Sequence, residues 1–293
     1  MFEDNIGQRD IRVVRTGDRE YQNNLFTDYL GRDNRALRVY EALTGNEYDD
    51  STEMQIYNMG SVLYNDLYND LSFVIDGKLV VFFEDQTTPN PNMPVRMLEY
   101  LSRYYEDYTK RDGKALIFSK TLVRLPKPEF IVFYNGEAGQ KNEIEYRLSD
   151  AFEQVTTLTS IELTVKVYNI NYDAHTELLA KSIELHDYAS LIHKVKHYLS
   201  ESNVIGTAIA LAVRDSIAEG VMVKYLKERR EETYSMLMTQ FVIDEQIKAA
   251  REDERIEAEE RQKASVRRMK AKGYPVSDIA EITGLSIEEI EAL

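Results

Sequence analysis

Three polar residues end an apolar segment of the sequence in a pattern that suits metal-dependent chemistry. Residues 79–83 are apolar throughout, and Glu84, Asp85 and Gln86 follow them directly. Such side chains are costly to bury unless they are paired. Because side chains alternate along a strand, Glu84 and Gln86 share one face and Asp85 takes the other. The end of this predicted strand therefore places a carboxylate and an amide side by side.

Asp70 stands at the start of the preceding apolar segment, and the turn between the segments decides whether it joins Glu84. An apolar run, an Asp-Gly pair and a second apolar run together predict a β-hairpin. A two-residue turn at Asp76 and Gly77 would put Asp70 on the opposite face from Glu84. A three-residue loop through Ile75, Asp76 and Gly77, or a bulge, would bring both carboxylates to one face, and the hypothesis of a shared site requires that register.

Two carboxylates on neighbouring strands of one face suit a hard divalent cation. Mg²⁺ typically takes one or two carboxylates, keeps several waters and accepts further oxygens from a substrate phosphate. The metal would lower the pKa of a bound water and stabilise charge on the phosphoryl oxygens. Gln86 would orient the water or the phosphate, but its neutral amide supplies neither a base nor a charge. We therefore expect Asp70 and Glu84 to be the metal ligands.

The elements around these residues predict a mixed sheet between helical layers. Residues 20–44 have apolar side chains at helical spacing, and Gly45 is a plausible C-cap, so we expect an opening helix or helix pair. A helix over residues 95–111 begins directly after Pro94. Strands are expected within residues 114–125, 129–136 and 161–172, and a further helix over residues 185–200. This order of elements is typical of an α/β fold.

The helix after the candidate site has two sets of residues at helical intervals. Its predicted packing stripe comprises Val95, Leu98, Leu101, Tyr105 and Tyr108. Arg96, Tyr100 and Tyr104 form a second series. Arg96 at the helix start is expected to contact a substrate phosphate, and Tyr100 is a candidate for substrate binding, although core packing is the preferred interpretation for both tyrosines.

The C-terminal third has a helical pattern. Residues 248–272 are densely charged with little apolar periodicity, which predicts an exposed helix stabilised by ion pairs between successive turns. Two short amphipathic segments meet near Gly284 and resemble a helix-turn-helix module. The second segment is acidic, which suits a DNA major groove poorly and favours protein contact or helix capping. We expect a core over residues 1–205, a charged helical extension over 206–272 and a terminal module over 273–293.

Composition limits the class of protein. The 293 residues are 43% hydrophobic and include no cysteine, which excludes disulfides, thiolate nucleophiles and cysteine zinc sites. No apolar stretch approaches the roughly 20 residues of a membrane span and no signal peptide is evident, so we expect a cytoplasmic protein without membrane contact. The net charge of −15 argues against nonspecific coating of nucleic acid, but a metal-dependent nuclease stays compatible with it.

The two histidines at positions 193 and 197 are four residues apart, as in helical zinc-binding pairs. No third ligand is evident, and an exposed basic helix face is the preferred interpretation.

A family resemblance rests on the segments around the candidate site. "NDLSF" at 69–73 and "EDQTTPNPNMPVRMLEYLSRYYE" at 84–106 resemble the recombination-promoting nuclease / putative transposase family of the PD-(D/E)XK nuclease superfamily. The likeness extends through "PEFIVFYNG", "VYNINY" and "LHDY" to the charged C-terminal extension, so it covers most of the chain. Where this sequence has Asp85, many members have His, and an acid pointing into the site would repel phosphate.

The resemblance implies a restriction-endonuclease-like core that cuts DNA with Mg²⁺ or Mn²⁺. Asp70 and Glu84 would be the ligands, and Gln86 stands where the superfamily usually has Lys. A further acidic ligand on the first helix is frequent in the superfamily, and Glu41 is the candidate. The activity implied is a DNA endonuclease linked to recombination, mobile elements or phage defence.

Other interpretations stay open at this point. Asp70, Glu84 and Gln86 would be ordinary solvated strand ends if they have no function. A nuclease fold without turnover would serve as a nucleic-acid-binding or protein-interaction module. The long charged helix would suit a homo-oligomer or scaffold joined through the C-terminal helices.

Overall fold

A computed structural model describes residues 24–49, 52–57, 70–110, 116–118, 120–136, 139–154, 159–202 and 204–293. The chain divides into two compact units. The first comprises the described parts of residues 1–86, 90–134 and 141–169, and the second comprises those of 87–89, 135–140 and 170–293. The candidate site residues Asp70, Glu84, Gln86, Arg96 and Tyr100 all belong to the first unit.

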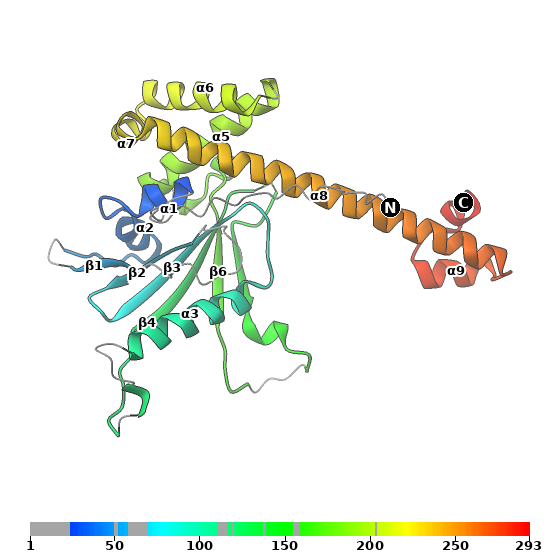
Figure 1. Cartoon of the computed structure of the whole chain (residues 1–293), viewed down its shortest axis with the longest axis horizontal. Helices are drawn as coiled ribbons and strands as arrows, with labels where there is room; N and C mark the ends of the chain where they lie inside the picture. Colours follow the sequence, from blue (N-terminus) through cyan, green and yellow to red (C-terminus); the bar gives the residue numbers. More distant parts are fainter. Residues whose placement is uncertain are drawn as a thin grey trace, which may run out of the picture. The chain divides into compact units, whose positions relative to one another are not determined.

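A six-stranded sheet forms the centre of the first unit (Figure 1). The strands are β1 (Met54–Tyr57), β2 (Asp70–Ile75), β3 (Leu79–Gln86), β4 (Lys127–Tyr134), β5 (Glu143–Arg147) and β6 (Thr164–Asn169), in the spatial order β1-β2-β3-β4-β6-β5. The pairs β3–β4 and β4–β6 are parallel, and the other neighbours are antiparallel. The predicted mixed sheet is therefore confirmed.

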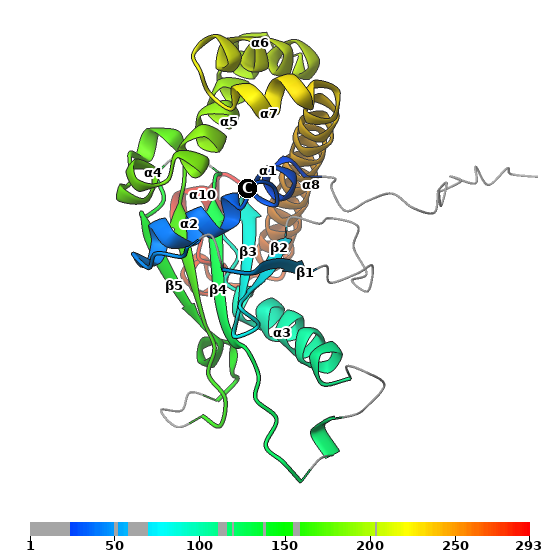
Figure 2. The ribbon, with the colours of Figure 1, turned by 90° about the vertical axis from the view of Figure 1, so that its left-hand side faces the viewer.

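Helices pack on both faces of this sheet. Figure 2 shows α2 (Arg35–Thr44) and α3 (Met93–Thr109) on opposite sides of the strands. On one face, Phe26 of α1 (Leu25–Leu30) lies 5.6 Å from Phe133, ring centroid to ring centroid. On the other face, Tyr104 of α3 meets Phe82 edge-on at 6.3 Å. The predicted opening helix pair and the α/β class are confirmed by this arrangement.

The predicted C-cap at Gly45 is also confirmed. Gly45 has φ of +70°, a left-handed conformation that glycine adopts without steric cost, and its N–H donates to the Glu41 carbonyl at 2.8 Å. Within the same helix, the Tyr40 hydroxyl donates to Glu129 of β4 at 2.8 Å. Burial, followed by this hydrogen bond, raises the pKa of Tyr40 well above its ordinary value.

Helix α3 begins with Pro94 in its first turn, as predicted, but a different stripe is buried. The core contacts come from Met93, Met97, Tyr100 and Tyr104, whereas Val95 is 46% exposed. The rest of the predicted stripe is only partly buried at the border of this core. Long methionine and tyrosine side chains of α3 fill the space against the sheet. The buried face of α3 is therefore shifted by about one residue from the predicted one.

The strand predicted over residues 114–125 is wrong for the residues that the structure describes there. Leu116–Phe118 forms a short 3-10 helix, and residues 120–126 have no regular structure. None of these described residues pairs with a strand of the sheet. Phe118 and Leu122 are 84% and 74% exposed, so the segment gains little of the side-chain packing that stabilises a strand.

The two edge strands, β1 and β5, were not predicted from sequence patterns. Both are short, and β5 has the charged residues Glu143, Glu145 and Arg147 alternating with its two apolar ones. Charged side chains on an edge discourage pairing with another chain. The same charges remove the apolar pattern by which central strands are recognised.

The second unit is helical where it is described. Its α-helices are α4 (Glu177–Lys181), α5 (Ile183–Ser202), α6 (Ile205–Ala218), α7 (Val223–Glu228), α8 (Arg230–Ala271), α9 (Val276–Thr283) and α10 (Ile287–Glu291). Helix α5 confirms the helix predicted at 185–200. The boundary expected after residue 205 lies inside this unit, at the first residue of α6. No helix among the described residues has the length and apolar character to cross a membrane.

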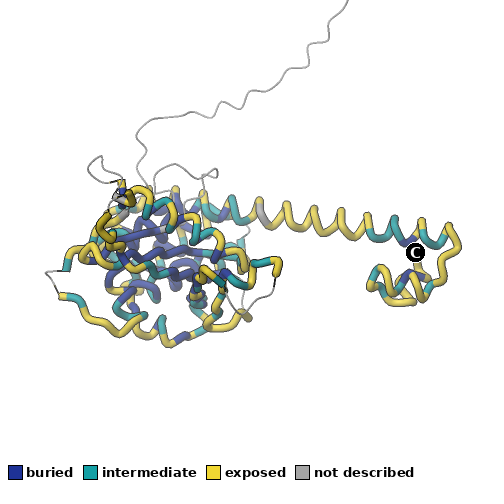
Figure 3. The backbone as a smooth tube through the Cα atoms, turned by 90° about the horizontal axis from the view of Figure 1, so that it is seen from below, coloured by how far each residue is buried: buried dark blue, intermediate teal, exposed yellow. Residues whose placement is uncertain are grey.

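The middle of α8 is supported by its own ion pairs, as predicted. Residues 248–261 are all exposed (Figure 3). Arg255 pairs with both Glu252 and Glu259, and Arg261 lies 3.8 Å from Glu257. Beyond this segment, Val266 of α8, Ile279 of α9 and Ile290 of α10 form a small buried cluster of their own. The two short terminal helices expected around Gly284 are thus present.

Phe133 provides a direct test of the packing between α1 and the sheet. Its ring is fully buried, 5.6 Å from Phe26 and 5.0 Å from Phe83. Phe133→Ala should lower the free energy of unfolding by about 3–5 kcal/mol, because it leaves a cavity in the aromatic layer. Urea unfolding followed by circular dichroism measures the change. Phe118→Ala, at an exposed position, should change it by less than about 0.5 kcal/mol, and equal effects would contradict this packing.

Candidate functional site

A three-residue loop sets the register of the β2–β3 hairpin. Ile75 pairs with Leu79, which leaves Asp76, Gly77 and Lys78 in the turn. The turn is closed by the Lys78 N–H, which donates to the Ile75 carbonyl at 2.9 Å. Asp76 and Gly77 adopt φ values of +50° and +63°, a region that Gly and Asp tolerate better than most residues. The loop has the odd length that the hypothesis required, one residue later along the chain than predicted.

This register places Asp70 directly opposite Glu84. Positions paired in this way lie on the same face of a sheet. Gln86, two residues further along β3, shares that face with Glu84, as predicted. Asp85 lies on the other face, where its strand partner is Phe133, and it is 3% exposed. Its negative charge is therefore separated from the Glu84 face by the sheet.

Glu84 is the buried acid at the centre of the candidate site. It is 2% exposed, and its Oε1 lies 2.8 Å from Arg96 Nη1. The same oxygen accepts a hydrogen bond from Gln86 Nε2 at 2.8 Å. Gln86 Nε2 also lies 2.7 Å from the sulfur of Met93. A buried carboxylate requires compensation of this kind, and here a guanidinium and an amide converge on one oxygen.

Arg96 and Tyr100 come from successive turns of α3. Arg96 Nη2 donates to the Tyr100 hydroxyl at 2.7 Å, and its guanidinium lies 5.7 Å from the centre of the Tyr100 ring. Tyr100 is 2% exposed, whereas the Arg96 side chain is 38% exposed. Tyr100 therefore packs in the core, the interpretation preferred from the sequence, and its hydroxyl also accepts a hydrogen bond from Arg96.

Two further polar residues continue the row beside Gln86, and the sequence patterns gave no prediction for them. In the register of the parallel strands, Gln86 pairs with Tyr134 of β4, and Tyr134 pairs with Asn169 of β6. Tyr134 and Asn169 are each 4% exposed. Both are the last residues of their strands. Their position at a predicted strand end was the feature of the sequence that could have identified them.

Glu41 does not join this group. Helix α2 packs on the face opposite to Glu84, where Tyr40 meets Phe73 of β2 at 6.5 Å. The Glu41 carboxylate instead accepts a hydrogen bond from the Tyr48 N–H at 2.8 Å.

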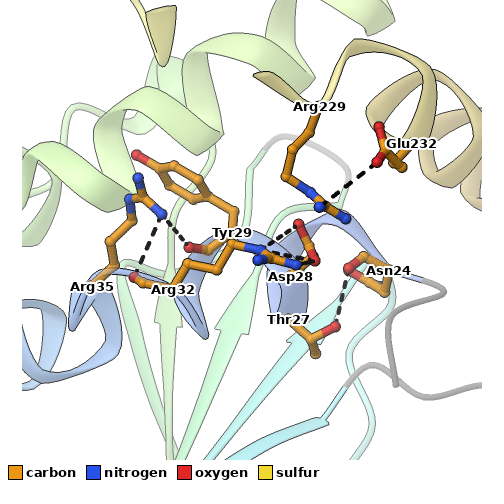
Figure 4. A network of polar contacts seen from close by, with 8 residues as sticks. All are labelled: Asn24, Thr27, Asp28, Tyr29, Arg32, Arg35, Arg229 and Glu232. Atoms are coloured by element: carbon orange, nitrogen blue, oxygen red, sulfur yellow. Dashed lines mark hydrogen bonds and ion pairs between the residues drawn. The ribbon is translucent and has the colours of Figure 1, made fainter. Parts of the chain in front are cut away.

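The fully buried acid of the opening helices is Asp28, which has a clear arginine partner. Asp28 accepts from Arg32 Nη2 at 2.8 Å and from Nε at 3.2 Å (Figure 4). This pair resembles Glu84 and Arg96: each consists of a buried acid and a partly exposed arginine, and Arg32 is 37% exposed. Helix α1 packs through Phe26 on the face of Phe133, opposite to that of Glu84. A second buried acid–arginine pair therefore lies on the other side of the sheet.

The two histidines of α5 have separate acidic neighbours. His193 Nδ1 lies 3.3 Å from Asp173, and His197 Nε2 lies 3.6 Å from Glu201. Both side chains are exposed, at 41% and 57%. This arrangement agrees with the exposed helix face preferred from the sequence.

Arg96 and Gln86 contact Glu84 through nitrogen donors, so a metal would have to use the carboxylate oxygens of Glu84 itself and of Asp70 opposite it. Among the residues whose side chains are described, which do not include Asp70, no three His, Asp or Glu gather as a metal site would. The pair formed by Asp70 and Glu84 offers two carboxylate positions, and carboxylates with several waters are the ligands that Mg²⁺ and Mn²⁺ accept. The chemistry of the donors fits the metal expected from the sequence.

Comparison of the chain with protein-family models, with curated proteins and with solved structures finds no match.

The Glu84–Arg96 pair can be tested by a double-mutant cycle on stability. Arg96→Met should lower the free energy of unfolding by about 1–3 kcal/mol, because it removes the guanidinium that lies 2.8 Å from a buried carboxylate, and the partial exposure of Arg96 limits the loss. Adding Glu84→Gln should recover most of this loss, since an amide needs no counter-ion. Urea unfolding at pH 7 measures Arg96→Met, Glu84→Gln and the double variant.

Arg103→Met is the control for that cycle. Arg103 is on the same helix, pairs with the exposed Glu99 at 2.6 Å, and should contribute less than about 1 kcal/mol. Losses that simply add in the double variant would show that Glu84 and Arg96 are not coupled.

Proposed function

We propose that this chain is a Mg²⁺- or Mn²⁺-dependent deoxyribonuclease of the PD-(D/E)XK type that hydrolyses DNA phosphodiester bonds. The observation that carries the proposal is the hairpin register, which sets Asp70 opposite Glu84 with Gln86 on the same face. The resemblance to the recombination-promoting nuclease / putative transposase family assigns the same three residues. Its biological setting, whether recombination, mobile elements or phage defence, comes from that resemblance alone.

The arrangement of the first unit supports the proposal. An antiparallel hairpin ends in the candidate residues, α3 follows, and the chain returns as β4 parallel to β3. Helices on both faces of such a mixed sheet agree with the restriction-endonuclease-like core that the resemblance implies. The connection through α3 brings Arg96 back to Glu84.

Each residue has a distinct role in the proposed hydrolysis. Asp70 and Glu84 hold the metal through carboxylate oxygens. A bound metal of this kind supplies an activated water and stabilises charge on the phosphoryl oxygens. Gln86 donates a hydrogen bond through its amide and orients the water or the phosphate. Arg96 binds the phosphate, and Tyr100 positions Arg96 through its hydroxyl.

A second candidate function is a nuclease-fold protein that binds nucleic acid or protein without turnover. One observation favours it: Glu84 Oε1 is engaged by Arg96 and Gln86, and Gln86 supplies no charge. The two candidates differ in whether the chain cuts DNA when a metal is supplied.

Cleavage of supercoiled plasmid tests the proposed activity. The wild-type protein should nick or linearise the plasmid with Mg²⁺ or Mn²⁺ and not with EDTA. Glu84→Gln and Asp70→Asn keep the side-chain size but remove a ligand charge, so each should lower the rate at least about 100-fold. Agarose gels of the time course measure the rates.

Glu99→Gln, on the exposed side of α3, is the matched control and should cut like the wild type. Urea unfolding of each variant shows that the fold is retained. If wild type, Glu84→Gln and Asp70→Asn all cut equally, or none of them cuts, the nuclease proposal is wrong and the binding module becomes the better account.

A further inference from the structure

We propose that Arg96 is an exchangeable counter-ion of Glu84. In the metal-free protein Arg96 neutralises the buried carboxylate, and when a divalent cation binds, Arg96 leaves Glu84 and takes a DNA phosphate instead. This inference rests on the proposed function, because it concerns the same carboxylate. Through this exchange, Arg96 would couple metal binding to DNA binding.

The shared oxygen is the first argument. Arg96 Nη1 lies 2.8 Å from Glu84 Oε1, and Gln86 Nε2 reaches the same atom at 2.8 Å. A divalent cation bound through this carboxylate would bring two positive charges close to the guanidinium, and their repulsion would oppose the present contact. Metal and Arg96 therefore compete for Glu84.

The partial exposure of Arg96 is the second argument. Its side chain is 38% exposed, in contrast to the buried Glu84 and Tyr100. Nη2 is held by the Tyr100 hydroxyl at 2.7 Å, and Nη1 also lies 3.6 Å from the Met93 sulfur. In the proposed exchange, the exposed guanidinium turns towards solvent and DNA while its hydrogen bond to the Tyr100 hydroxyl keeps it at the site.

The anion that Arg96 binds after it leaves Glu84 follows from the chemistry of the guanidinium. Arginine stays charged at all physiological pH values and presents paired donors that match phosphate oxygens. A guanidinium displaced from a carboxylate keeps its need for an anion, and a phosphodiester bound at the metal is the anion that the proposed reaction brings there. Metal binding would thus prepare the site for DNA.

Mn²⁺ binding without DNA tests the competition. Free Mn²⁺ is measured by electron paramagnetic resonance, with every variant in the same buffer. Arg96→Met should bind Mn²⁺ about tenfold more tightly than wild type, because the competing cation is gone. Glu84→Gln should lose most of the binding.

Arg32→Met is the matched control. It removes the arginine from the other buried pair, Asp28–Arg32, whose exposure is nearly the same. It should leave the Mn²⁺ affinity unchanged, whereas a gain equal to that of Arg96→Met would overturn the exchange at Glu84.

The outcomes separate this inference from the proposed function. If Arg96→Met binds Mn²⁺ no more tightly than wild type while Glu84→Gln no longer binds Mn²⁺, the proposed exchange is wrong and the metal site at Glu84 is kept. If Glu84→Gln binds Mn²⁺ as well as wild type, the metal is not at Glu84, and the proposed function fails together with the exchange.

The salt dependence of DNA binding tests the transfer to phosphate. One phosphate contact changes the slope of log K against log salt by about 0.9 for duplex DNA. Wild type and Arg96→Met should have equal slopes in EDTA, and in Ca²⁺ the wild-type slope should be steeper by about that amount. Fluorescence anisotropy with a labelled duplex measures the slopes, and equal slopes in Ca²⁺ would refute the transfer.

Discussion

The length of one turn determines the character of the sheet face around Glu84. Because Asp76, Gly77 and Lys78 form a three-residue loop, every side chain of β2 meets its partner from β3 on a common face. With one residue fewer, Asp70 would lie across the sheet from Glu84 and no pair of carboxylate positions would exist. Left-handed conformations at Asp76 and Gly77 accommodate that length. The site therefore depends on backbone geometry six residues away from Asp70 and Glu84.

The same face has to accommodate charge next to an apolar core. Val80 and Phe82 of β3 pack with Met97 and Tyr104, and Glu84 comes one step further along the strand. A carboxylate in that position requires a cation nearby, and α3 supplies it through Arg96 in its first turn. A metal could meet the same requirement. An arginine and a metal ion can therefore play the same part as the partner of one buried acid. The contact that stabilises the site is for this reason linked to its proposed chemistry.

Periodicity predicted those parts of the structure that depend on local sequence. The hairpin, α5, β4 and β6 follow from alternation or helical spacing, and Pro94 marked the start of α3. Patterns did not predict the Glu84–Arg96 contact, because it joins the end of a strand to a helix residue of a different element, which periodicity within one element cannot show. They also predicted a strand where Phe118 and Leu122 are exposed, since an apolar run alone does not show whether its segment will pair with another strand.

The central claim is that Asp70 and Glu84 together bind one divalent cation. Anomalous X-ray scattering from crystals of the full chain soaked in Mn²⁺ tests it most directly, because it locates the metal without relying on activity. The account predicts one strong peak within bonding distance of both carboxylates, with Arg96 moved away from Glu84. A peak at other residues, or no peak at Glu84 in crystals that hold Mn²⁺ elsewhere, would contradict it.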